Sequence, residues 1–200
     1  GIVYGGLSKK KRNIFQIGFF LNFEVSFKNN KPASINAELS DPFISSIIND
    51  KYKLNCLMSV TSLINLSITD GQKLNKIYEI SNNFLMFMFF NKKWFHQYCD
   101  FLFKLLKIIG YEIDYLVDKK NKYFDLDKLI FIERKTSNSI EFPFDLLNST
   151  NTKLEKYSVN HIFIIFETVF VKNHLSNFNL SLPNQYHLFK KLIVDKINLK

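Results

Sequence analysis

The chain has 200 residues, a formal net charge of +9 and 46% hydrophobic residues. This apolar fraction is too high for an intrinsically disordered chain, and 22 Phe and 9 Tyr provide enough bulky side chains for a folded core. The positive excess favours a polyanionic partner. It is densest at the start, where residues 1–31 carry six Lys or Arg against the single acid Glu24.

The first 42 residues show the alternation of apolar and polar side chains that is typical of β-strands. Residues 2–4 predict a short strand, and residues 19–27 place an apolar side chain at every second position. Residues 29–32 (Asn-Asn-Lys-Pro) predict a turn, and residues 34–39 repeat the alternation. We therefore predict a hairpin with one apolar side, preceded by a basic loop.

From residue 43 onward the apolar period becomes helical. It predicts helices over 51–68, 72–90 and 93–109, with Gly110 ending the last of them. Residues 111–127 are polar and predict a linker or exposed loop, and 128–133 with 139–142 predict a small hairpin. Two further helices are expected, one over 159–175 and one that starts after Pro183 and continues to about residue 197.

Strands followed by helices favour an α+β protein with two segregated parts over a parallel α/β sheet. We predict two domains. The first, residues 1–42, is a β part. The second, residues 43–200, is an all-α helical domain with a small β-hairpin inserted near residues 128–142.

The candidate binding residues are the run Lys9, Lys10, Lys11 and Arg12, which follows the glycine pair Gly5-Gly6. A flexible turn beside four cations can bring backbone amides and ammonium groups against phosphates. A solvated turn without function is the alternative for such a run. Its place between strands favours nucleic-acid binding. Further candidates are Lys28 and Lys31 at the hairpin end, with Tyr4, Phe20 and Tyr52 as base-stacking surfaces or, more simply, core residues.

Neither a catalytic residue nor a metal site is predicted, and no cofactor is expected. The chain contains no P-loop, G-x-G-x-x-G, G-x-S-x-G or H-E-x-x-H motif. His96, Cys99 and Asp100 share a helix without a second ligand pair, and Asp125 and Asp127 resemble a charged strand entry. His161 and Glu167 are expected to mark the polar stripe of an apolar helix.

We infer the cellular compartment from the absence of disulfide, signal-peptide and membrane-span patterns in the sequence. Cys56 and Cys99 form neither a C-x-x-C motif nor a disulfide framework. The basic run interrupts any early apolar stretch, and the longest apolar run covers only residues 84–90, far short of the ~20 residues that cross a bilayer. We expect a cytoplasmic protein without a membrane partner.

Several motifs in the same order resemble the RecO recombination-mediator family. They are G-I-V-Y-G-G-L-S-K-K-K-R-N-I-F-Q-I-G at the start, A-E-L-S-D-P-F, I-I-G-Y-E-I-D-Y, I-F-I-E-R-K-T-S-N-S-I, and L-S-N-F-N-L-S-L-P before the last helix. The chain departs from the family at Ile17, where a proline is usual. Residues 116–124 lack the cysteines of the members that bind zinc, so zinc is not expected.

The resemblance implies that residues 1–42 are a nucleic-acid-binding domain built as a partial OB-like β-barrel. It also implies a non-enzymatic DNA-repair and recombination mediator. Such proteins bind single-stranded DNA, anneal complementary strands, engage the C-terminal tail of single-strand-binding protein, and work with RecR to load RecA. The resemblance carries DNA contacts over to Lys9, Lys10, Lys11 and Arg12. Family members have further strands before the position of Gly1, so we expect either a truncated sequence or a barrel built without its first hairpin.

Two alternatives stay open at the level of sequence. The helical part acts as a protein-interaction scaffold if the barrel no longer binds DNA. An RNA-binding OB module fits the charge equally well, because no residue pattern here reads a 2′-hydroxyl.

Overall fold

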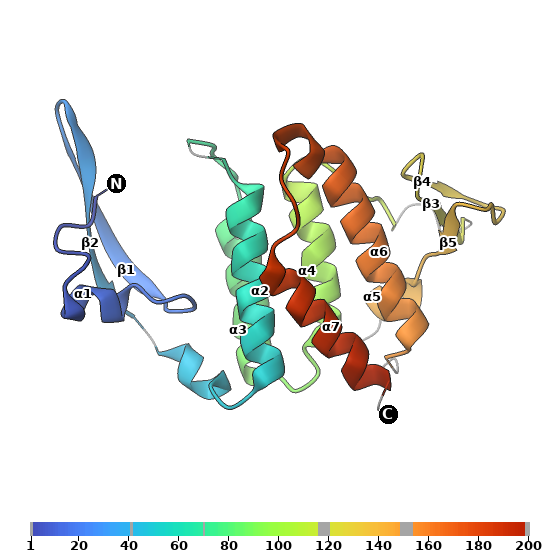
Figure 1. The fold of residues 1–200 in the computed structure, drawn as a ribbon, viewed down its shortest axis with the longest axis horizontal. Coiled ribbons are helices and arrows are strands. Elements are labelled where there is room, and N and C mark those ends of the chain that lie inside the picture. The colour runs from blue at the N-terminus through green and yellow to red at the C-terminus, as the bar shows by residue number, and fades with distance from the viewer. Residues whose placement is uncertain (1, 41, 70, 116–120, 149–153, 199–200) are drawn as a thin grey trace.

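The computed structural model describes residues 2–40, 42–69, 71–115, 121–148 and 154–198 (Figure 1). The protein is α+β and mainly helical. Its elements in chain order are α1 (Lys9–Ile14), β1 (Leu21–Lys28), β2 (Lys31–Leu39), the 3-10 helix η1 (Phe43–Ile47), α2 (Lys51–Ser67), α3 (Ile77–Phe90), α4 (Phe95–Ile108), β3 (Tyr123–Asp125), β4 (Ile130–Ile132), β5 (Ser139–Glu141), α5 (Phe144–Asn148), α6 (Lys156–Asn173), the 3-10 helix η2 (Leu175–Phe178) and α7 (Asn184–Asn198).

The core of the helical part is centred on Tyr98 of α4, which is fully buried. Its ring centroid lies 6.0 Å from that of Phe84 in α3, 6.4 Å from Phe163 in α6 and 4.8 Å from Phe189 in α7. Its hydroxyl lies 3.2 Å from the Ser59 hydroxyl in α2. One side chain therefore contacts four helices, and its burial raises the pKa of the Tyr98 phenol well above the usual value.

Charged side chains tie neighbouring helices together at the edge of this core. The Lys53 ammonium of α2 is buried and donates a 3.0 Å hydrogen bond to the Phe89 carbonyl, in the last turn of α3. A cation is favourable there because the last carbonyls of a helix lack backbone partners. The Lys190 ammonium of α7 donates to both carboxylate oxygens of Glu167 in α6, at 2.7 and 2.9 Å.

Residues 2–40 form an N-terminal arm at one side of the helices (Figure 1). Strands β1 and β2 pair antiparallel, with Leu21 opposite Leu39 and Val25 opposite Ile35, and helix α1 lies against β2. Ile2 adds a single parallel bridge to Ser34. The strands in the described parts of the chain do not close into a barrel, so the partial OB-like barrel is not confirmed and only its hairpin is present.

The arm joins the helices through Gly18 and Phe20. The Phe20 ring packs edge-on against Phe43 of η1 at 5.4 Å and Phe89 of α3 at 6.2 Å. Gly18 has φ +88°, and a Cβ at this position would overlap Leu57 Cδ2 of the buried core. Only glycine meets both requirements, because it tolerates positive φ and has no side chain.

The second sheet differs from the hairpin predicted near residues 128–142. Strands β4 and β5 do not pair with each other, because β3 lies between them and pairs antiparallel with both. The polar stretch 111–127 was predicted as a linker or loop, and its described residues instead include this central strand. Three residues are too few to show a period, and β3 depends on partners that follow it in sequence.

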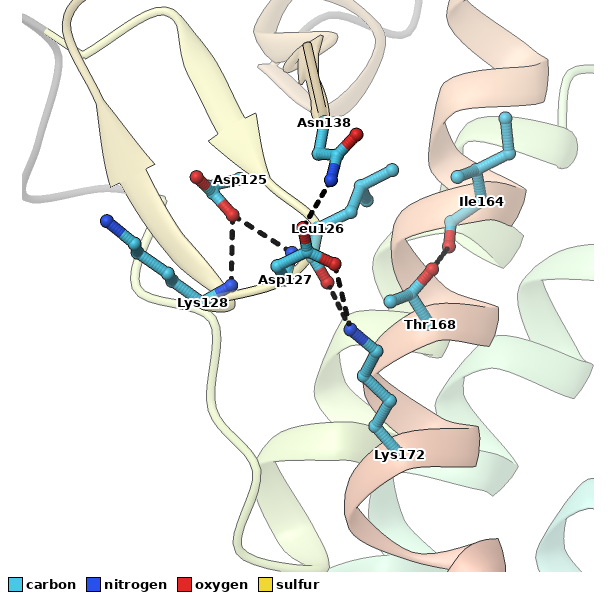
Figure 2. Close-up of polar contacts among 8 residues, drawn as sticks. All are labelled: Asp125, Leu126, Asp127, Lys128, Asn138, Ile164, Thr168 and Lys172. Carbon is cyan, nitrogen blue, oxygen red and sulfur yellow. Dashed lines mark hydrogen bonds and ion pairs between the residues drawn. The ribbon is translucent and has the colours of Figure 1, made fainter. Parts of the chain in front are cut away.

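Helix α6 holds this sheet at two points. The Lys172 ammonium donates to the Leu126 carbonyl at 2.8 Å and forms a 3.5 Å ion pair with Asp127 (Figure 2). Near the other end of α6, His161 Nδ1 lies 2.6 Å from the Glu141 carbonyl of β5.

The basic run 9–12 is also different from its prediction, because it is the short helix α1 and not a loop. The Ser8 hydroxyl accepts a hydrogen bond from the Lys11 backbone N–H and so caps the first turn. Lys and Arg are good helix formers, and the cations Lys11 and Arg12 lie in the last turn, where positive charge is favourable.

The predicted helices over 51–68, 72–90, 93–109, 159–175 and 183–197 are confirmed as α2, α3, α4, α6 and α7. The main boundary error is at α3, which begins at Ile77 after Lys76 adopts a left-handed conformation with φ 69°.

Replacing Gly18 with alanine tests how the arm is joined to the helices. We expect Gly18→Ala to lower the free energy of unfolding by about 2–4 kcal/mol, through the strained φ and the overlap with Leu57. Gly110→Ala is the matched control, because Gly110 has φ +93° with no atom within 4 Å of the added Cβ, and about 1 kcal/mol is expected. Urea unfolding followed by circular dichroism measures both, and equal losses would contradict the packing described.

Candidate nucleic-acid interface

The first group of predicted binding residues lies on α1. Lys9 and Arg12 are exposed and Lys11 is partly buried. Lys10 lies in the same helix, and its side chain is outside the described residues. Because a single turn of helix carries all four residues, their charges are concentrated at the base of the arm.

Within the described parts of the chain, no ion pair neutralises Lys9, Lys11 or Arg12. Ion pairs elsewhere in those parts include Lys104 with Asp100, Lys107 with Glu112, Lys172 with Asp127 and Lys190 with Glu167, and these four lie in the helical part or beside the second sheet. The described cations of α1 therefore have no carboxylate partner, and the same holds for Lys28 and Lys31. Unpaired cations at a surface attract polyanions.

Lys28 and Lys31 form a second basic group at the hairpin tip. They are cross-strand partners at the end of β1 and the start of β2, and both are exposed. Like charges directly opposite each other in a sheet destabilise it. An anion bound between the two ammonium groups relieves this repulsion, so the tip suits a phosphate.

The structure does not bring the two groups together. Figure 1 shows α1 at the base of the arm and the hairpin tip at its far end. The eight residues of β1 span about 23 Å at ~3.3 Å per residue. A ligand that contacts both groups must therefore be extended and run along the hairpin, as a single nucleic-acid strand does.

The three predicted stacking residues lie in different environments in the structure. Phe20 packs into the joint of the arm, and Tyr52 lies under the Lys196 ammonium at 3.9 Å, so neither offers an open ring face. Tyr4 is 63% exposed, as a stacking surface requires. Two further aromatic side chains that were not predicted as stacking surfaces are also exposed, Phe23 at 65% and Phe27 at 84%.

Phe23 and Phe27 share one side of β1 with Val25, as the alternation predicted. The pattern indicates which side chains share a face. It does not indicate whether another layer covers that face, and among the described residues no layer does.

The side chains considered for catalysis or metal binding have structural roles. The Asp125 carboxylate accepts hydrogen bonds from the backbone N–H groups of Asp127 and Lys128, both at 2.9 Å. Asp127 accepts from the Asn138 amide and pairs with Lys172 (Figure 2). The two acids therefore fix the turn between β3 and β4 and hold it to α6.

The His96, Cys99 and Asp100 group does not form a metal centre. Asp100 pairs with Lys104 at 2.7 Å, and His96 and Cys99 are buried in the helical core. Burial raises the pKa of the Cys99 thiol far above its usual range, which keeps the sulfur protonated. Across the described segments, no three His, Cys, Asp or Glu side chains are grouped as metal ligands would be.

Searches of protein-family models, curated proteins and solved structures find no match to this chain. Within the described residues, every helix is too short or too polar to cross a bilayer.

The Asp125 turn gives a pH-dependent prediction. Hydrogen bonds from the Lys128 and Asp127 backbones lower the pKa of the Asp125 carboxyl below 3.8. The stabilisation is therefore complete above pH 3.8 and is lost as the pH falls through the lower folded-state pKa. We expect Asp125→Ala to lower the urea midpoint at pH 7, with the difference narrowing towards about pH 2.

Asp127→Ala is the control for this prediction, because it changes the same turn but removes only an exposed ion pair and side-chain contacts. A difference between wild type and Asp125→Ala that does not change with pH would show that the carboxylate charge is not the cause.

Proposed function

We propose that the N-terminal arm binds single-stranded nucleic acid. The observation that carries the proposal is the set of unpaired cations at both ends of the arm, on α1 and at the Lys28–Lys31 tip. Phosphate contacts supply most of the affinity of sequence-independent binding. The two basic groups lie at opposite ends of the hairpin. A ligand that contacts both must therefore be extended, as a single nucleic-acid strand is.

The exposed rings of the arm support a single strand over a duplex. Phe23 and Phe27 lie on one side of β1, between the two basic groups. Unpaired bases stack on aromatic side chains, each contributing about 1–3 kcal/mol, whereas the bases of a duplex are already stacked on one another. Cations together with exposed aromatic side chains are typical of surfaces that hold single strands without reading sequence.

The biological role proposed with this activity is DNA repair and recombination mediation. It is based on the resemblance of the motifs to the RecO family, in which the hairpin corresponds to part of an OB-like barrel. The protein would then anneal strands, help load RecA together with RecR, and engage the C-terminal tail of single-strand-binding protein through its helical part, without acting as an enzyme.

A protein-docking role for the arm is the second candidate. Its support is the apolar side of β1, where Phe27 is 84% and Phe23 65% exposed, since large exposed apolar surfaces often mark protein contacts. The two candidates differ in salt dependence. Binding to phosphates weakens steeply as counterions compete, whereas apolar docking does not.

The salt dependence of binding to labelled oligo-dT tests the primary proposal. With about four phosphates neutralised, affinity should fall roughly fiftyfold between 50 and 200 mM salt, from a slope near −0.7 per contact. The variant Lys9→Ala/Lys10→Ala/Lys11→Ala/Arg12→Ala should lose most of these phosphate contacts. The dependence of log affinity on log salt concentration should therefore become much shallower. Fluorescence anisotropy at several salt concentrations measures it, and an unchanged slope would exclude α1 as the main contact.

A variant with the same loss of charge elsewhere separates a local effect from a general one. Lys73→Gln/Lys76→Gln/Arg134→Gln/Lys135→Gln removes four exposed cations outside the arm. Its salt slope should match wild type. Comparing oligo-rU with oligo-dU of the same length distinguishes a DNA-binding from an RNA-binding module, because the bases and backbone phosphates are shared and the 2′-hydroxyl is not.

A further inference from the structure

Strand β1 forms an open edge of the N-terminal hairpin. The opposite edge, on β2, is bonded to Ile2, whose backbone N–H donates to the Ala33 carbonyl at 2.7 Å and whose carbonyl accepts from the Ile35 N–H at 2.9 Å. The odd-numbered residues of β2 therefore face Ile2 and the even-numbered ones face β1, because alternate residues of a strand bond to opposite sides. It follows from the register that the odd-numbered residues of β1 direct their backbone groups away from β2.

This edge lacks backbone partners within the described parts of the chain. Its residues are Phe23, Val25 and Phe27, and residues 22–28 of β1 are all exposed. Natural sheets protect such edges with proline or with a bulge, because an unpaired strand is a template for another strand. In this hairpin Pro32 and the extra residue at the register shift are both in β2, so β1 has neither protection.

The sequence of the open edge is symmetric about Val25. Phe23 and Phe27 lie two residues before and after it, and all three side chains are on one side of the strand. If two copies pair antiparallel with Val25 opposite Val25, each Phe23 lies opposite Phe27 of the other copy. The odd-numbered residues then form the hydrogen-bonded pairs, as their backbone orientation requires. Aromatic and β-branched pairs of this kind stabilise neighbouring strands.

The charges of β1 are compatible with the same register. Glu24 lies opposite Ser26 of the other copy and Lys28 lies opposite Asn22, so like charges are not directly opposed. At the diagonal positions Glu24 has the other Glu24 on one side and Lys28 on the other, and the longer lysine side chain favours the ion pair. Because residues 21–28 carry one acid and one base, two copies of a +9 chain meet here without a local excess of positive charge.

We propose that two copies of this chain associate through β1 and join their hairpins into one antiparallel four-stranded sheet. The two-fold axis passes between the two Val25 residues, perpendicular to the sheet, so the apolar sides of both β1 strands face the same way. Pairing uses the backbone edge and leaves the rings of Phe23 and Phe27 accessible. The inference goes beyond nucleic-acid binding and does not rest on it. Salt weakens binding to phosphates but not this pairing, so either can fail without the other.

Single cysteine substitutions in the full chain test the register. The native Cys56 and Cys99 are buried, so the introduced thiol is the accessible one. Val25→Cys places two thiols across the axis, where paired Cα atoms are about 5.5 Å apart, within the span of a disulfide. Phe27→Cys is the matched control, because its two thiols are four residues out of register, about 13 Å along the strands.

Mild oxidation followed by non-reducing electrophoresis should give a covalent dimer from Val25→Cys and little from Phe27→Cys. Circular dichroism checks that both variants keep the helical fold. The proposal is overturned if Val25→Cys gives no covalent dimer, or if the yield from Phe27→Cys equals or exceeds it.

Variants at Ser26 test the pairing without cysteine chemistry, by sedimentation equilibrium. Ser26→Lys puts a cation opposite each Glu24 and should strengthen self-association roughly three- to tenfold, whereas Ser26→Glu opposes like charges and should weaken it by a similar factor. A general effect of net charge acts in the opposite direction, because lysine adds to the +9 of the chain. A wild type that stays monomeric up to about 0.5 mM, or variants that associate equally or in the reverse order, would overturn the proposal.

Discussion

The packing of α2, α3, α6 and α7 around Tyr98 of α4 is the constraint on which the rest of the structure depends. A buried phenol that touches rings on three helices and a hydroxyl on a fourth fixes the positions of all of them. The second sheet and the N-terminal arm are attached to this frame. The second sheet is held by Lys172 and His161 of α6, and the N-terminal arm rests on the outside of α2 and α3 through Gly18 and Phe20.

This attachment explains why the arm is suited to an extended ligand. Its contacts with the core are concentrated at the joint, so most of β1 is left open to solvent on both sides. The cations of α1 and the tip remain without carboxylate partners because the acids that form ion pairs lie elsewhere in the described structure.

Elements with a long apolar period could be predicted from the sequence, and elements made by non-local contacts could not. Helix α4 has one continuous apolar face, and its limits differ from the prediction by only a few residues. Strand β3 has three residues and exists only through β4 and β5. The cations of the candidate interface could be identified in the sequence. Their separation into two groups and the exposure of Phe23 and Phe27 depend on the three-dimensional fold and could not.

The most direct test of the central claim, that the arm is where a single strand binds, is photocrosslinking of the full chain to 4-thiothymidine oligonucleotides, with the linked peptides identified by mass spectrometry. The account predicts crosslinks in residues 2–40, with Phe23, Phe27 and Tyr4 among the labelled positions. Crosslinks confined to the helices from α2 to α7 would contradict it and assign nucleic-acid binding to another surface.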